Sequence, residues 1–191
     1  MKKKILIIAG GFSREREISL KTAKGVFNAI KKKYITKICE PNGELIKNLR
    51  SFKPNVVFNA LHGRYGEDGY VQSILESTNV PYTHSGVISS AMAMDKELSK
   101  KIFIKHKILT PRYITFDFDL SKKNLLEMIE KKLKFPVVIK PLNEGSSVNV
   151  FICSKKNIFK KLKLLSEYKK IIIEEYIPGR EIQAAIIGTK K

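Results

Sequence analysis

A lysine followed by a short run of glycine and serine is the pattern in this sequence that most directly predicts chemistry. Lys140 ends an apolar run at residues 137–139, and Gly145, Ser146 and Ser147 follow shortly after it. Glycine lets the backbone approach an anion closely, loop N–H groups and hydroxyls donate to its oxygens, and the ammonium supplies charge. The pattern predicts a phosphate-binding loop, and taken alone it fits an ordinary hairpin with an exposed lysine equally well.

The composition indicates a protein with a proper hydrophobic core. The chain has 191 residues, enough for one large domain or two small ones, and 43% of them are hydrophobic. No apolar run is long enough to span a bilayer. Three lysines near the start resemble the beginning of a signal peptide, but the apolar run after them stops at Ala9, which is too short. We therefore expect a cytoplasmic protein without a membrane partner.

The strong positive charge raises the possibility of a nucleic-acid partner. The formal net charge is +19, from 37 Lys and Arg against 18 Asp and Glu. The lysines are spread along the whole chain, arginine is scarce, and no basic-aromatic RNA-binding motif is present. This distribution favours solvated helix faces and anionic small-molecule substrates over nucleic acid, and a basic nucleic-acid-binding protein stays the third alternative.

The two cysteines predict neither a disulfide framework nor a metal site. Cys39 and Cys153 are far apart and each lies in or beside a β-branched run. We expect both to be reduced thiols in or near the core.

The first half of the chain alternates apolar strands with helical segments. Strands are predicted at residues 4–9, 35–39 and 55–61, with helices after Gly10-Gly11 and at 44–52, the first capped by Ser13 or Ser19. This order predicts a parallel sheet with crossover helices, whose ligands bind beyond the carboxyl ends of the strands. Those ends, residues 10–15 and 62–68, are rich in glycine and polar groups.

Short helices are predicted at residues 69–77 and 88–94, and a charged helix from residue 95 to about 106. The domain change is expected between Asp95 and Pro111. The second half is predicted as a two-layer α+β domain, and its elements are strand 113–116, helix 121–133, strands 137–140 and 148–153, helix 154–167 and strand 171–176. A further strand is expected at 181–187.

Five segments in the same order resemble the D-alanine–D-alanine ligases of the ATP-grasp superfamily. They are residues 10–20 (GGFSREREISL), 60–72 (ALHGRYGEDGYVQ), 81–96 (PYTHSGVISSAMAMDK), 136–148 (PVVIKPLNEGSSV) and 174–181 (EEYIPGRE). The resemblance covers the whole chain. Because ligases of this family run well beyond this point, the chain is expected to be their amino-terminal two-thirds or so.

The resemblance implies an α/β fold, in which an N-terminal parallel-sheet (pre-ATP-grasp) domain precedes the first, α+β half of an ATP-grasp domain. The expected divisions are a substrate-side domain at 1–94, a central ATP-grasp subdomain at 95–180, and the start of a carboxyl-terminal subdomain at 181–191. The implied chemistry uses ATP to phosphorylate one D-alanine, and the amine of a second D-alanine then attacks the acyl phosphate. The dipeptide serves peptidoglycan synthesis. The implied cofactors are ATP and Mg²⁺, with the Mg²⁺ ligands expected outside this chain, and a homodimer is left open.

On the substrate side, the resemblance implies roles for three residues. Glu15 resembles the carboxylate that holds the ammonium of the first D-alanine, and Ser146 the serine that orients Glu15 and the substrate. These two are the candidate catalytic residues. His62 resembles a substrate-site histidine. Without the resemblance, Glu15 reads as a helix-start charge and His62 as a structural histidine.

On the nucleotide side, Lys96 and Lys140 resemble the two lysines that reach the phosphates, and Ser146 and Ser147 lie in the phosphate loop. The remaining implied nucleotide contacts are Glu174 and Ile177 at adenine and Glu181 at the ribose. Without the resemblance, Lys96 is one lysine among many on a helix. A serine hydrolase is not supported, because GSSVN is not the G-x-S-x-G elbow and no triad pattern accompanies it.

Three positions depart from the pattern of the family. Glu175 stands where the hinge usually has lysine, Asn149 where the phosphate loop ends in glycine, and His84 where a glycine precedes Ser85-Gly86. Asparagine is compatible with a left-handed backbone at that position.

The leading interpretation is ATP-dependent ligation of two D-alanines by a chain that lacks its carboxyl-terminal part. The alternatives are a non-catalytic nucleotide-binding remnant and one piece of a split ligase. The sequence does not determine whether the second substrate is D-alanine, D-lactate or D-serine.

Overall fold

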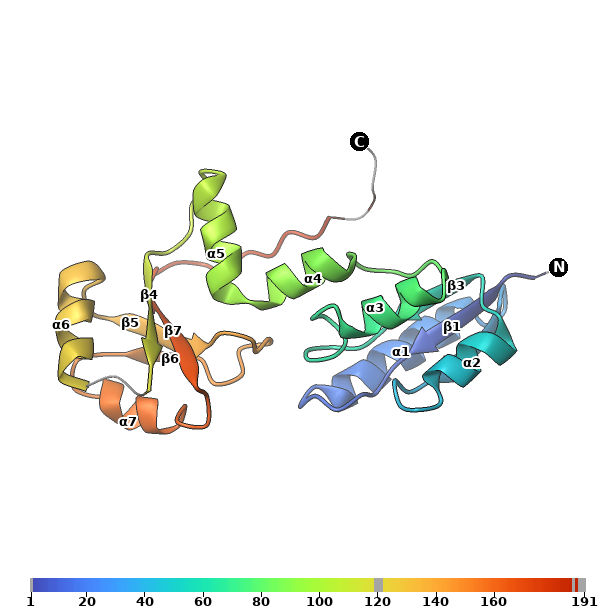
Figure 1. Cartoon of the computed structure of the whole chain (residues 1–191), viewed down its shortest axis with the longest axis horizontal. Coiled ribbons are helices and arrows are strands. Elements are labelled where there is room, and N and C mark those ends of the chain that lie inside the picture. The colour runs from blue at the N-terminus through green and yellow to red at the C-terminus, as the bar shows by residue number, and fades with distance from the viewer. Residues whose placement is uncertain (1, 119–121, 187, 189–191) are drawn as a thin grey trace. The chain divides into compact units, whose positions relative to one another are not determined.

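The computed structural model describes residues 2–118, 122–186 and 188, and the chain divides into two compact units (Figure 1). The first unit comprises Met1–Thr110 and Lys140–Val150, and the second comprises Pro111–Ile139 and Phe151–Lys191. The division predicted at residues 94/95 and 180/181 stays a prediction. Ser121, Ile187 and residues 189–191, which fall within predicted elements, lie outside the described residues.

A three-stranded parallel sheet forms the centre of the first unit. Its strands are β1 (Lys4–Ile8), β2 (Ile35–Cys39) and β3 (Val56–Asn59), in the order β2-β1-β3. β1 is parallel to both neighbours, with Ile7 opposite Ile38 on one side and Phe58 on the other. The continuous apolar sequence of β1 fits this central, doubly covered position, and the predicted parallel sheet is confirmed.

Helices cover both faces of this sheet. α1 (Arg16–Ile30) packs on the face that carries Ile7 and Ala9. α2 (Leu45–Phe52) and α3 (Tyr70–Ser77) pack on the opposite face, against Leu6 and Ile8. Successive strand residues point to opposite faces, so one apolar strand supplies both layers of the core.

The predicted caps of α1 were wrong. α1 begins at Arg16 with Glu15 as its N-cap residue, and no side chain caps it. Ser19 is instead buried inside the first turn, where its hydroxyl accepts the N–H of Gly10 at 2.8 Å and donates to the carbonyl of Ala60 at 2.8 Å. The hydroxyl finds partners across the sheet edge, so it joins three segments instead of ending one helix.

Two further helices complete the first unit, α4 (Val87–Met94) and α5 (Lys96–Lys105). Asp95 caps α5, because its carboxylate accepts the N–H of Leu98 at 2.9 Å. The helix predicted to start at residues 95 and 96 therefore forms.

The second unit is built on a four-stranded sheet. β4 (Tyr113–Asp117), β5 (Val137–Pro141), β6 (Phe151–Cys153) and β7 (Lys170–Glu175) lie in the order β4-β7-β5-β6, with β4 antiparallel to β7 and β5 antiparallel to β6. α6 (Lys122–Lys132) and α7 (Ile158–Lys163) contribute to one core with the sheet, through residues such as Leu125 and Ile158. The predicted two-layer α+β arrangement is confirmed.

Three predicted elements are shorter or absent. β6 lacks residues 148–150, because the left-handed backbone at Ser147 and Asn149 cannot continue a strand. α7 ends at Lys163, after which i to i+3 bonds such as Leu165 N–H to the Leu162 carbonyl close tight turns. Residues 181–186 are exposed and form no strand, since no neighbouring strand pairs with them among the described residues.

Cys39 and Cys153 are buried and are not joined by a disulfide, as predicted. Among the described residues, no helix is both long and apolar enough to cross a bilayer.

Candidate active site

Glu15 lies in the loop that joins β1 to α1. The residue is only 8% exposed. Ser13 shapes this loop, because its hydroxyl accepts the N–H of Glu15 at 3.2 Å and donates to the carbonyl of His62 at 2.7 Å. The loop that carries Glu15 is thereby joined to the loop that follows β3.

His62 lies in the loop after β3, at the same carboxyl edge of the sheet. Its Nε2 is 3.2 Å from the hydroxyl of Thr22 on α1, and its Nδ1 is 3.7 Å from Oε1 of Glu67. Glu67 also accepts the N–H of Gly63 at 2.9 Å. The imidazole is therefore held between one helix and one loop.

The segment from Lys140 to Val150 brings the predicted phosphate loop into the first unit. Ser146, Ser147 and Asn149 have positive φ angles of 46°, 59° and 56°. Such a conformation is unfavourable for residues other than glycine, although asparagine adopts it more readily than most. Asn149 thus takes a left-handed backbone, with which asparagine is compatible.

Ser146 connects the phosphate loop to Glu15. Its hydroxyl donates a hydrogen bond to Oε1 of Glu15, a residue 131 positions earlier in the chain. The other oxygen of Glu15 lies so close to Gly63 that a Cβ there would be 2.8 Å away, and a Cβ at Gly145 would be 3.7 Å away. Two glycine backbones and one serine hydroxyl therefore enclose the carboxylate.

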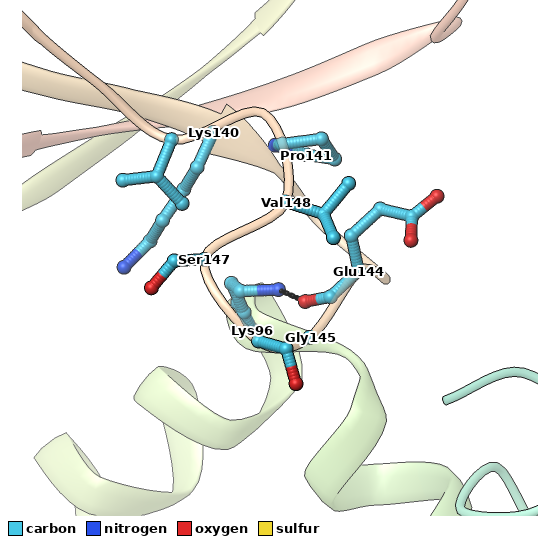
Figure 2. Close-up of a pocket in the computed structure, with 9 residues that line it drawn as sticks. Lys96, Lys140, Pro141, Glu144, Gly145, Ser147 and Val148 are labelled. Carbon is cyan, nitrogen blue, oxygen red and sulfur yellow. Dashed lines mark hydrogen bonds between the residues drawn. The ribbon is translucent and has the colours of Figure 1, made fainter. Parts of the chain in front are cut away.

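Lys96, the first residue of α5, reaches the same loop. Its Nζ donates to the carbonyl of Leu142 at 3.1 Å and to the carbonyl of Glu144, and the second bond is drawn in Figure 2. The backbone N–H of Lys96 also donates to the Leu142 carbonyl at 3.2 Å. Lys96 therefore fastens the start of α5 to the loop.

Lys96 and Lys140 line one cavity of about 250 Å³. The remaining lining residues are Pro141, Glu144, Gly145, Ser146, Ser147, Val148 and Val150. In Figure 2 the side chains of Lys140 and Ser147 extend from the same side of the loop. Two ammonium groups, the hydroxyl of Ser147 and a glycine-containing backbone give this cavity donors of the kind that an oxyanion requires, while the O–H of Ser146 is donated to Glu15.

A second cavity of about 160 Å³ lies beside Glu15. The lining residues are Phe12, Ser13, Arg14, Glu15, Gly63, Arg64, Tyr65, Glu144 and Val148. Glu144 and Val148 line both cavities, so the phosphate loop forms a wall that the two share. An anion in the first cavity and a small zwitterion in the second would be neighbours across this loop.

The structure thus brings together Glu15, Ser146, Ser147, Lys96 and Lys140. His62 is joined to Glu15 through Ser13. Sequence reasoning assigned no part in the site to four residues that line or support these cavities, namely Ser13, Thr22, Tyr65 and Glu67, and it singled out Ser13 only as a helix cap. Ser13 and Glu67 stand in the predicted ligand loops and could have been singled out on that ground, whereas nothing in the sequence pairs Thr22 with His62.

The three predicted adenosine contacts belong to the second unit. Glu174 is buried on β7, and by strand alternation its side chain lies on the face opposite to Ile171 and Ile173, which pack with the helices. Ile177 and Glu181 are exposed in the irregular segment after β7.

Glu175, the departure at the hinge, forms an ion pair with Arg112. Its carboxylate accepts the backbone N–H of Arg112 at 2.8 Å and the guanidinium Nε at 2.8 Å. Arg112 also donates to the carbonyls of Lys132 and Leu133. Glu175 therefore ties the end of β7 to the start of β4 and the end of α6.

Among residues 2–118, 122–186 and 188, no group of three or more His, Cys, Asp or Glu side chains could hold a metal ion.

Comparison with known proteins supports the reading of the fold. The family described as D-ala D-ala ligase N-terminus matches residues 37–85, and the one described as D-ala D-ala ligase C-terminus matches residues 103–191. The D-alanine–D-alanine ligase of Pelagibacter ubique is 62% identical over 191 residues, which are 100% of this chain and 63% of that protein. The chain therefore spans less than two thirds of the length of this relative.

Solved structures agree with these matches. The D-alanine–D-alanine ligase of Bacillus anthracis superposes with a TM-score of 0.81 and 35% identity, covering 93% of this chain and 58% of that one. The structure of this ligase complexed with ATP gives a TM-score of 0.77 and 32% identity, with 93% and 60% covered.

A parallel α/β unit that includes the lysine-flanked Gly-Ser-Ser loop, together with an α+β unit, defines a protein of the ATP-grasp class. Within that class, the chain belongs to the D-alanine–D-alanine ligase family.

Proposed function

We propose that this chain provides the first amino-acid site and the phosphate-binding loop of an enzyme that joins two D-alanines at the expense of ATP. The hydrogen bond from Ser146 to Glu15 carries the proposal. It places a cavity suited to oxyanions directly beside a buried carboxylate suited to an ammonium. Phosphoryl transfer to the carboxylate of an amino acid requires the phosphate and the amino acid to be held next to each other in a fixed geometry.

Glu15 is proposed to bind the ammonium of the first D-alanine. A charge-assisted hydrogen bond of this kind is stronger than a neutral one, because both partners are ionised. Ser146 holds the carboxylate of Glu15 in one orientation. With its ammonium on Glu15, the bound amino acid is proposed to direct its own carboxyl group toward the phosphate loop that the two cavities share. His62 is proposed to border the same amino acid.

Lys96, Lys140, Ser146, Ser147 and the loop N–H groups are proposed to bind the phosphates. ATP, when bound, supplies the phosphoryl group that turns the D-alanine carboxylate into an acyl phosphate. Catalysis of such a transfer is mostly positioning and charge neutralisation, and the two lysines supply positive charge at the phosphates. Glu174 and Ile177 are proposed to contact adenine, and Glu181 the ribose.

A role for magnesium is inferred only from membership of the D-alanine–D-alanine ligase family. Because the described residues offer no cluster of ligands, no step is assigned to it here. The proposed partners are ATP and D-alanine in the cytoplasm, and no nucleic acid is required.

The proposal is tested with an extended chain, defined as residues 1–191 fused to the carboxyl-terminal part of the 62% identical relative. Mixed with ATP, magnesium and D-alanine, the extended chain should release ADP and phosphate and form D-alanyl-D-alanine. Replacement of Glu15 by Gln should abolish dipeptide formation. Absence of D-alanine-dependent ADP release, together with tight DNA binding at physiological salt, would contradict the proposal.

A further inference from the structure

The two loops that carry Glu15 and His62 meet at a single hydroxyl group, that of Ser13. We propose that Ser13 is a positioning residue that holds Glu15 and His62 in one fixed relation, and so sets the affinity for the first amino acid. The part of this inference that concerns affinity rests on the function proposed above.

The hydroxyl of Ser13 is used in both of its hydrogen-bonding roles. Its single O–H donates to the carbonyl of His62 at 2.7 Å, and its oxygen accepts the N–H of Glu15 at 3.2 Å. The backbone carbonyl of Ser13 also accepts the N–H of Arg16 at 3.2 Å. The hydroxyl therefore has one defined orientation, and both loops depend on it.

The packing around Ser13 leaves little freedom for either loop to shift. A Cβ at Gly63 would lie 3.4 Å from the Cβ of Ser13 and 2.8 Å from Oε2 of Glu15. The backbone at Gly63 therefore approaches both Ser13 and the carboxylate too closely for a side chain to fit between them. A movement of one loop away from the other would displace Glu15 from Ser146.

The hydrogen bonds of Ser19 already hold α1 against this edge of the sheet, so the Ser13 hydroxyl is not needed to keep α1 in place. Ser19 already joins α1 to the loop after β1 and to the end of β3, through Gly10 and Ala60. Removal of the Ser13 hydroxyl should therefore leave the sheet and α1 in place. The effect is expected at Glu15 and His62 instead.

The first test is amide hydrogen exchange on residues 1–191, comparing Ser13→Ala with the parent. Exchange of the Glu15 N–H should become at least about tenfold faster, because its acceptor is lost, while the Gly10 N–H held by Ser19 should not change. Ser77→Ala is the matched control, since Ser77 also donates to a carbonyl at 2.7 Å but within one helix. Unchanged exchange at Glu15 would overturn the proposal.

The second test uses the extended chain. Ser13→Ala should raise the Michaelis constant for the first D-alanine at least about tenfold and leave that for ATP within about twofold, whereas a general loss of structure would change both. An unchanged constant for D-alanine would overturn the role in affinity. If the parent makes no dipeptide, the proposed function fails and the affinity role falls with it, while the exchange measurement still decides whether Ser13 holds Glu15.

Discussion

At the scale of single residues, the carboxylate of Glu15 lies so close to Gly63 that a side chain at position 63 would displace it. Gly63 has a φ of +67°, and a Cβ added there would meet Oε2 of Glu15 at 2.8 Å. Gly145 also lies near the carboxylate, but a Cβ there would be 3.7 Å from the same oxygen, an ordinary contact distance. The two glycines therefore offer a matched pair of substitutions.

Gly63→Ala is expected to displace the Glu15 carboxylate and to strain the backbone. The left-handed conformation costs a residue with a Cβ about 1–2 kcal/mol, so the free energy of unfolding should fall by about that amount. In the extended chain, the Michaelis constant for the first D-alanine should rise at least about tenfold. Gly145→Ala should change neither quantity by as much. Equal effects of the two substitutions, measured by urea unfolding and initial rates, would refute this account of the carboxylate.

The sequence predicted which residues form the candidate site, but it did not predict all of the contacts between them. Motif resemblance singled out Glu15, Ser146 and both lysines before their positions were known. The resemblance also implied that Ser146 orients Glu15, although the two residues are 131 positions apart and no pattern in the sequence itself pairs them. Likewise, no sequence pattern shows that Lys96 donates to the carbonyls of Leu142 and Glu144.

At the scale of elements, several turns depend on residues other than glycine in left-handed conformations. His84 has a φ of +84° and stands where the family pattern has glycine. It precedes Gly86, the N-cap residue of α4. The backbone of this turn therefore has a conformation that suits glycine better than histidine.

His84→Gly is expected to stabilise the protein slightly. Relief of the left-handed strain contributes about 1–2 kcal/mol, while the greater flexibility of glycine in the unfolded chain costs about 0.5–1 kcal/mol. The variant should therefore be more stable than His84→Ala, which keeps the strain, by about 0.5–1 kcal/mol in urea unfolding. A glycine variant less stable than the alanine variant would show that the turn carries no such strain.

The buried thiol of Cys39, at the end of β2, makes the stability of the fold depend on pH. Burial raises the pKa of the Cys39 thiol from 9.0 to about 11, and Lys37 opposes the shift only in part. Between these values the unfolded chain releases a proton that the folded chain retains, so stability falls as pH rises. Two pKa units correspond to at most about 3 kcal/mol.

Urea unfolding at pH 8 and at pH 10.5 should show this loss, and the loss should be smaller in Cys39→Ala. Lysines and tyrosines titrate in the same range, so the difference between the two proteins is the informative quantity. An equal fall in the free energy of unfolding of both proteins between these pH values would mean that Cys39 does not ionise on unfolding.

The fold was predictable where the sequence pattern was strong. β1 and β3 are apolar runs that end in glycine or polar loops, and both formed where expected. β6 and α7 were predicted too long, because residues 148–150 (VNV) and 164–167 (LLSE) include apolar side chains that suit a strand or a helix, but the backbone there forms turns and irregular structure. Residues 181–186 have a strand-like composition, but a strand forms only when another strand pairs with it.

At the scale of the whole molecule, the net charge is +19, and the lysines that produce it are spread along the whole chain. Some of these side chains form ion pairs at the surface, for example Lys47 with Glu44 at 3.1 Å, in which both side chains are exposed. Exposed pairs of this kind contribute about 0–1 kcal/mol each, so they do not account for the stability of the fold.

Residues 1–191 alone are expected not to make D-alanyl-D-alanine. Phosphoryl transfer to a carboxylate uses metal ions that bridge the phosphates, and the described residues offer no cluster of metal ligands. The check is ADP release with ATP, magnesium and D-alanine, run beside the extended chain. Robust D-alanine-dependent turnover by residues 1–191 would show that these residues suffice for catalysis.

The affinity for ATP of the Lys140→Ala variant tests most directly the claim that the loop after β5 binds nucleotide phosphates. In the extended chain, ATP is titrated into the parent, Lys140→Ala and Lys163→Ala, the last being an exposed lysine on α7 with the same change in charge. Loss of one phosphate contact, about 1.4 kcal/mol, should raise the dissociation constant of Lys140→Ala at least about tenfold and leave that of Lys163→Ala within about twofold. Equal dissociation constants in all three proteins would contradict the claim.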